Sequence, residues 1–178
     1  ITTNGDLCFT NAVTLTAPVT LSSGTGTLCI QGAFNSGAFN LTLRGAEIDI
    51  DPTGSLTGTA ALTLEPDTAA KNVVLGAASS DASAGLDFSS DELGRINDGY
   101  ASLTFGRTDG TGVLSVASPV TLRDPSTLRM NGVGGSIAVN AALTGTGNGA
   151  FAFNSPTTTF DAGITTAGGG VSVVGPLR

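Results

Sequence analysis

Short stretches of alternating apolar residues recur along the chain at a nearly constant spacing. Three of them, Leu7-Cys8-Phe9, Leu28-Cys29-Ile30 and Ile48-Asp49-Ile50, follow one another at intervals of 21 and 20 residues with the same parity. Alternation with a period of two predicts strands of about three to five residues. A fixed interval with constant parity predicts that equivalent strands stack about 4.8 Å apart, as in a β-solenoid.

We therefore predict an all-β fold, a right-handed parallel β-helix that forms a single domain over residues 1–178. A β-sandwich is the alternative, although a sandwich does not require the same register every 20 residues or so. Dividing 178 residues by about 20 per coil predicts roughly nine coils. One short helical turn is expected near residues 90–95, because Ser89 and Glu92 have the spacing of a capping box and Gly94 limits the run.

One phrase of the sequence is used twice. Pro18-Val-Thr-Leu21 returns as Pro119-Val-Thr-Leu122, 101 residues later, which is close to five of the short intervals. Proline is tolerated at the first residue of a strand, so we predict that Pro18 and Pro119 mark structural corners where the chain enters a strand. Gly106, Asp109 and Gly110 lie in "GRTDGTG", which carries an Asp-Gly turn signal and predicts another corner.

The two cysteines, Cys8 and Cys29, are one interval apart. Each stands between apolar neighbours, so both side chains should point to the same side of stacked strands, within the Cα separation that a disulfide accepts. We predict a Cys8–Cys29 disulfide and an oxidising compartment. Two free buried thiols are the alternative.

Carboxylates offer the main chemical possibilities. Glu47, Asp49 and Asp51 alternate and would project from one strand face about 7 Å apart, which suits a Ca²⁺ site or an acid/base pair. A solvated outer face is the interpretation that we favour for this row. The other carboxylate pairs of interest are Asp91 with Glu92, and Asp98 with Asp109.

Several function classes are disfavoured. The chain has no His, which excludes Ser-His-Asp and Cys-His arrangements and imidazole metal sites. Its net charge of −7 argues against nucleic acid, and no apolar run is long enough to span a membrane. We expect no enzyme activity, no cofactor and no metal. Asn40-Leu-Thr42 is a possible glycosylation sequon. The scattered arginines, expected to pair with nearby acids, are Arg95, Arg107, Arg123 and Arg129.

Residues 86–155 resemble the repeat region of large secreted filamentous-haemagglutinin-like proteins of bacteria. The similar segments are Glu92-Leu93-Gly94-Arg95-Ile96, Leu103 to Gly112, Pro119 to Leu122, and "GSIAVNAALTGTG" at 135–147. The resemblance implies an extracellular or cell-surface β-helix from a secreted bacterial protein. It implies no particular ligand.

Two functions follow as hypotheses. The first is a non-enzymatic structural or adhesive module of a surface or biofilm-matrix filament, which could also contact surface glycans. The alternative is a carbohydrate-binding or polysaccharide-cleaving β-helix, which would need aromatic side chains for sugar stacking, whereas this chain has one Tyr and no Trp. Both ends look strand-like and carry no capping helix. This favours head-to-tail association of copies, with a fragment of a longer β-helix as the other explanation.

Overall fold

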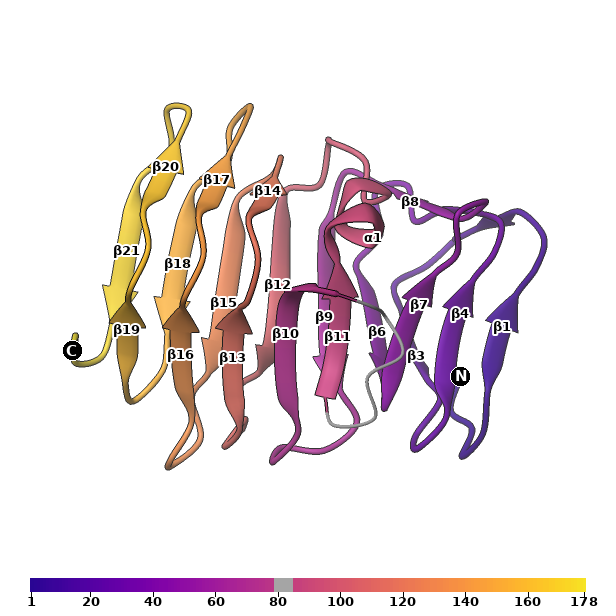
Figure 1. The fold of residues 1–178 in the computed structure, drawn as a ribbon. Coiled ribbons are helices and arrows are strands. Elements are labelled where there is room, and N and C mark those ends of the chain that lie inside the picture. Colours follow the sequence, from indigo (N-terminus) through magenta and orange to yellow (C-terminus); the bar gives the residue numbers. More distant parts are fainter. Residues whose placement is uncertain (79–84) are drawn as a thin grey trace.

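Parallel strands stack in successive coils to form a β-solenoid, as the sequence predicts (Figure 1). The computed structural model describes residues 1–78 and 85–178. Every strand pairing in it is parallel, and each strand pairs with strands from neighbouring coils. The strands form three faces, which we call A, B and C.

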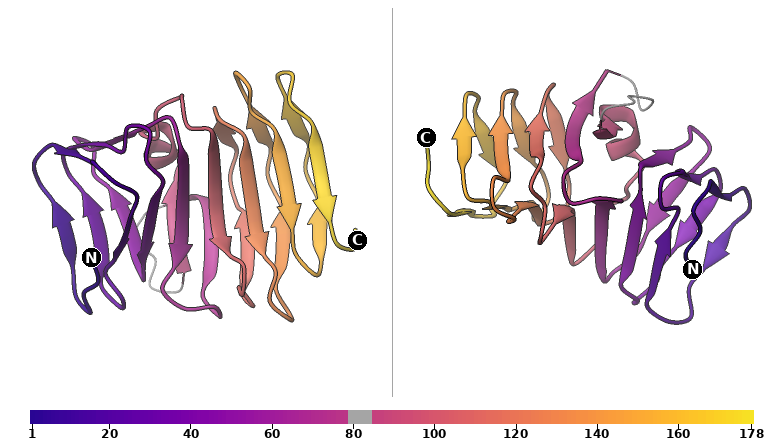
Figure 2. Two further views of the ribbon diagram at one scale, coloured as in Figure 1. Left: turned by 180° about the vertical axis from the view of Figure 1, so that it is seen from behind. Right: turned by 90° about the horizontal axis from the view of Figure 1, so that it is seen from below.

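Face A is a single sheet that continues through the whole stack (Figure 2). It has seven strands, whose bounds are β3 (Val19–Ser22), β6 (Leu41–Gly45), β9 (Ala61–Pro66), β12 (Ser102–Arg107), β15 (Ser126–Met130), β18 (Phe151–Asn154) and β21 (Val171–Val174).

Faces B and C are each divided into two sheets. Face B comprises β1 (Leu7–Phe9), β4 (Thr27–Ile30) and β7 (Glu47–Ile50), then β11 (Gly85–Ser89), β10 (Asn72–Ala77), β13 (Val113–Val116), β16 (Ser136–Val139) and β19 (Thr158–Phe160). Face C comprises β2 (Val13–Thr14), β5 (Ala33–Asn35) and β8 (Ser55–Thr57), then β14 (Val120–Leu122), β17 (Leu143–Gly145) and β20 (Ile164–Thr166).

The register of face A corrects the number of coils from about nine to seven. Residues in register along this face are Val19, Leu41, Leu62, Leu103, Ser126, Phe151 and Val171, so the coils measure 22, 21, 41, 23, 25 and 20 residues. The sequence estimate failed because the fourth coil is about twice as long as its neighbours. Short intervals near the N-terminus gave no sign of it.

The interior of the solenoid is a column of apolar side chains stacked like upon like. On face A the inward column runs through Leu21, Leu43, Leu64, Phe105, Leu128, Phe153 and Val173. The residues beside it point outward and are mostly Thr. Period-two alternation therefore separates a dry core from a hydroxyl-rich surface, and the β-branched Thr suits this pleated surface.

The long fourth coil changes the direction of the stack. After β10 the chain returns to face B as β11, which pairs with β10 in parallel, so this coil places two strands on face B and one on face A. Face B thus has eight strands against seven on face A. An additional strand occupies about 4.8 Å on one side only, and the stack bends at this coil (Figure 2, right).

The short helix α1 (Ser90–Gly94) follows β11 directly. Ser89 is its N-cap, and the reciprocal Ser89–Glu92 hydrogen bonds of a capping box are present, as predicted. Ile96 then forms a bridge with Leu56 of β8, and the chain continues into β12.

The repeated phrase begins a strand at both places, but on different faces. Pro18 precedes β3 on face A, whereas Pro119 precedes β14 on face C. The 101-residue interval is therefore not a whole number of coils, contrary to the sequence interpretation.

The predicted corner at "GRTDGTG" is only partly a turn. The Gly110 amide donates to the Arg107 carbonyl (3.2 Å), which closes a turn through Asp109. Gly106, in contrast, lies within β12 with a φ of +91°. A Cβ at this position would lie 2.1 Å from the Arg129 carbonyl oxygen of the next coil, so the strand requires glycine here.

The substitution Gly106→Ala tests this requirement. Gly134→Ala is the matched control, because Gly134 also has a positive φ (+88°) but nothing within 4 Å of the added Cβ. Both variants bear the cost of a left-handed backbone, and only Gly106→Ala adds a clash, so it should reduce the free energy of unfolding by about 1–3 kcal/mol more. Chemical denaturation measures the difference, and equal losses would contradict the proposed clash.

Candidate functional site

Cys8 and Cys29 form the predicted disulfide. They are register partners on β1 and β4, with their Cα atoms 4.5 Å apart. Leu28 and Ile30 on either side of Cys29 point into the core and are fully buried, so the disulfide lies on the outer side of face B. It links the first coil to the second along the axis of the stack.

The row Glu47-Asp49-Asp51 does not form the Ca²⁺ site considered from the sequence. Asp51 accepts hydrogen bonds from the Thr53 amide (3.1 Å) and hydroxyl (2.9 Å), which occupy its carboxylate in a turn and lower its pKa. In the described residues, no three His, Cys, Asp or Glu side chains are arranged to hold a metal ion. The favoured interpretation, a solvated face, also fails for Glu47, because this side chain is partly buried where β7 meets β11.

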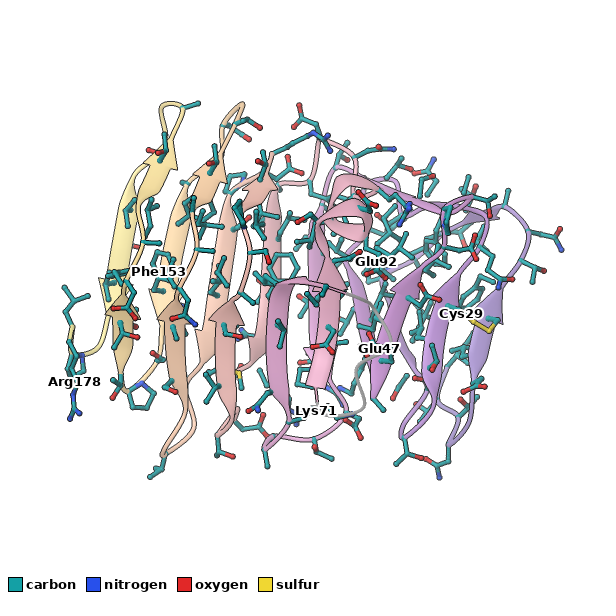
Figure 3. The ribbon with its side chains drawn as sticks, viewed as in Figure 1. Cys29, Glu47, Lys71, Glu92, Phe153 and Arg178 are labelled. Carbon is teal, nitrogen blue, oxygen red and sulfur yellow. A yellow bond between two sulfur atoms is a disulfide. The ribbon has the colours of Figure 1, made fainter. Side chains whose placement is uncertain are left out.

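The boundary between β7 and β11 is the most unusual site of the molecule, and we call it the seam. Within the described chain no ladder hydrogen bonds join these two strands, so the outer edge of β7 lacks a strand partner. Unpaired main-chain groups at a buried edge are costly, and proteins cover them. Figure 3 shows Glu47, Glu92 and Lys71 gathered along this boundary.

Two carboxylates satisfy the amide groups of the β7 edge. Glu47 accepts from the Ile48 amide (3.1 Å) and also bonds the Asp87 amide of β11, so it bridges the seam. Glu92 accepts from the Ile50 amide (3.1 Å) and from the Ser89 amide and hydroxyl (2.9 and 2.8 Å). The Glu92 carboxylate thus holds the helix cap and the strand edge together.

Two cationic side chains satisfy the carbonyl groups of the same edge. Lys71 donates to the Ala46 carbonyl (2.8 Å) and lies 3.3 Å from an Asp67 carboxylate oxygen. Arg95, just after α1, donates to the Ile50 carbonyl (2.9 Å). Charged side chains therefore replace the ladder that a regular strand would have supplied.

Burial makes the acids of the seam difficult to ionise. It raises the pKa of Glu47 to about 8, and the nearby carboxylates of Asp87 and Glu92 add to the effect. Burial also raises the pKa of Glu92, against the hydrogen bonds that it accepts, and the pKa of Asp87, against the charge of Lys71. Asp87 is only 2% exposed, and its Oδ2 has no hydrogen-bond partner.

The other carboxylate pairs are arranged differently from the sequence expectation. Asp109 pairs with Arg107 (2.8 Å) rather than with Asp98. The carboxyl beside Asp98 is that of Asp124, which is 1% exposed and accepts from the Gly99 amide (3.0 Å). Burial, then the adjacent Asp98, raise the pKa of Asp124. Asp91 is exposed on α1, whereas its neighbour Glu92 is buried.

The arginines mostly bind main-chain carbonyls, not acids as predicted. Arg123 donates to the carbonyls of Gly94 and Ile96, and Arg129 donates to that of Gly106. Arg107 matches the prediction through Asp109, and Arg44 pairs with Glu65 of the next coil. Asn40 of the sequon is exposed, and its side-chain oxygen accepts from the Ala61 amide (3.2 Å).

Comparison with known proteins gives no relative: no family model, curated protein or solved structure matches the chain. The resemblance to filamentous-haemagglutinin-like proteins therefore stays a prediction. In the part of the chain that the structure describes, no helix is long and apolar enough to cross a membrane.

Removal of the disulfide by a Cys8→Ala/Cys29→Ala double substitution should lower the free energy of unfolding by about 3 kcal/mol, because the closed loop of about 20 residues no longer restricts the unfolded chain. Denaturation with and without reductant measures this loss. Reductant should destabilise the natural protein and leave the double variant unchanged. An equal response of both proteins would count against the bond.

Glu92→Ala should destabilise the fold by about 1–3 kcal/mol, because buried donors of Ile50 and Ser89 lose their acceptor. Asp91→Ala is the control, since this exposed neighbour should change stability by only about 0.5 kcal/mol. Urea denaturation compares the two. A similar small loss in both variants would show that the carboxylate does not hold the seam.

Proposed function

We propose that the protein is a non-enzymatic, extracellular structural module that stacks end to end with further copies of itself as a subunit of a surface or matrix filament. The observation that carries this proposal is the state of the core at the two ends. Inward-facing residues of the middle coils are almost completely buried, whereas those of the first and last coils are only partly buried. These partly buried residues include Leu7, Phe9, Val13, Phe160, Ile164 and Val173.

The strand edges support the same proposal. The Ile1 carbonyl accepts from the Ser22 amide (2.9 Å), so the first residues add a short strand to β3 on face A. The Pro176 carbonyl accepts from the Thr158 amide (3.1 Å), so the last residues extend face B. In the described chain, β1, β2, β20 and β21 pair on one side only. Such edges take up further strands readily.

Apolar side chains cluster on the last coil beside these edges. Val171, Val174 and Leu177 are 49%, 63% and 60% exposed. A second copy stacked on this coil would bury them and would continue the inward columns of the core. The contact joins two different surfaces and does not close, which produces a filament.

The surface favours a structural role over polysaccharide cleavage. None of the aromatic side chains of the described residues is exposed, and Tyr100 is 1% exposed. Sugar rings commonly stack on exposed aromatic faces. Incubation with acidic and neutral polysaccharides tests the carbohydrate hypothesis directly, since cleavage or saturable binding would favour it.

The substitution Val174→Asp should prevent stacking, because it places a charge on the apolar edge of the last coil. Val133→Asp is the control: Val133 is 96% exposed in a loop, away from both ends. We expect the chain of residues 1–178 and the control to form elongated species that grow with concentration, and Val174→Asp to stay monomeric. Light scattering and electron microscopy measure this. A monodisperse natural protein at high concentration would refute the proposal.

A further inference from the structure

The seam divides face B into two sheets while face A continues past it. On face B the first three coils, with β1, β4 and β7, have no ladder to the strands that follow. On face A, β6 and β9 pair in register across the same level. The two parts of the stack are therefore joined by a full ladder on one side and by side chains on the other. This is the geometry of a joint with one fixed edge and one edge that can open.

The charged groups of the seam come from every element packed around it. β7 contributes Glu47 and Asp49, and Asp51 follows it; β11 contributes Asp87; α1 contributes Glu92, with Arg95 at its end; and Lys71, with its partner Asp67, precedes β10. Acids outnumber bases here. Lys71 and Arg95 are held by the Ala46 and Ile50 carbonyls. Full ionisation of the acids would leave an excess of negative charge at a poorly solvated boundary, where like charges repel strongly.

We propose that the seam is a proton-controlled joint: with Glu47 protonated it holds β7 against β11, and ionisation of Glu47 opens face B at this level while face A stays paired. Glu47 occupies the central position, because its carboxyl bonds the Ile48 amide on one strand and the Asp87 amide on the other. Asp87, with an unpartnered Oδ2, and Glu92 lie on the opposite side of the boundary. A charge on Glu47 would be repelled by both.

The direction of the pH dependence follows from the raised pKa of Glu47. Between the ordinary pKa of 4.5 and about 8, the closed seam keeps a proton that the open seam releases. Closing is therefore favoured at low pH and becomes less favourable as pH rises through this window, by up to about tenfold in the equilibrium constant per pH unit. Above about pH 8 this contribution is lost completely. The raised pKa values of Asp87 and Glu92 act in the same direction.

Amide hydrogen exchange followed by NMR tests the joint. After correction for intrinsic exchange rates, the protection of the Ile48, Ile50 and Asp87 amides should fall by up to tenfold per unit from pH 5.5 to 8, while the Leu43 and Leu64 amides of face A stay protected. In Glu47→Gln the seam amides should lose this pH dependence, because the neutral amide side chain still offers an acceptor. Asp161→Asn is the charge-matched control, since Asp161 is exposed in another coil, and it should behave as the natural protein does.

Three outcomes would overturn the proposal. Seam amides of the natural protein could keep constant protection across the window. Glu47→Gln could retain the natural pH dependence. Face A amides could lose protection in parallel, which would indicate global unfolding. A carboxyl titration by ¹³C NMR adds an independent check on the folded natural protein: a Glu47 midpoint near 4.5 would also reject the joint.

Discussion

Main-chain hydrogen bonding between neighbouring coils is the constraint on which the whole structure depends. Each strand is three to six residues long in most coils, too short to be stable alone, and obtains its partners only from the coil before and the coil after. The side chains must therefore stack in register, which selects small and β-branched residues outside and apolar columns inside. Glycine is required where the next coil comes too close for a Cβ, as at Gly106.

The fourth coil departs from this constraint and shows how it can be relaxed. A second strand of one coil, β11, enters face B and leaves the edge of β7 without a ladder. Glu47, Glu92, Lys71 and Arg95 supply the missing hydrogen bonds. Side chains can do this only as ions or as acids held in a partly dry environment, so the repair introduces titratable groups into a fold that otherwise has few.

The sequence predicts the regular parts of the fold and none of the irregular ones. Interval and parity are enough to find the stacked strands β1, β4 and β7, the Cys8–Cys29 pair and the capping box of α1. Alternation cannot tell a strand that begins a new face from a second strand on the same face, so β11 and the true number of coils were missed. The seam partners Ile50 and Glu92 are 42 residues apart, which matches no interval in the sequence.

The position of the disulfide has a mechanical consequence. In this fold the ladder hydrogen bonds run along the axis of the stack, so a pull along the axis loads them directly. Between the first two coils the Cys8–Cys29 bond runs in the same direction and carries the load covalently. At the seam, face B has only side-chain contacts to resist the same force. Tension would therefore leave the first coils intact and concentrate extension at the bend, where the molecule has length in reserve in its longest coil.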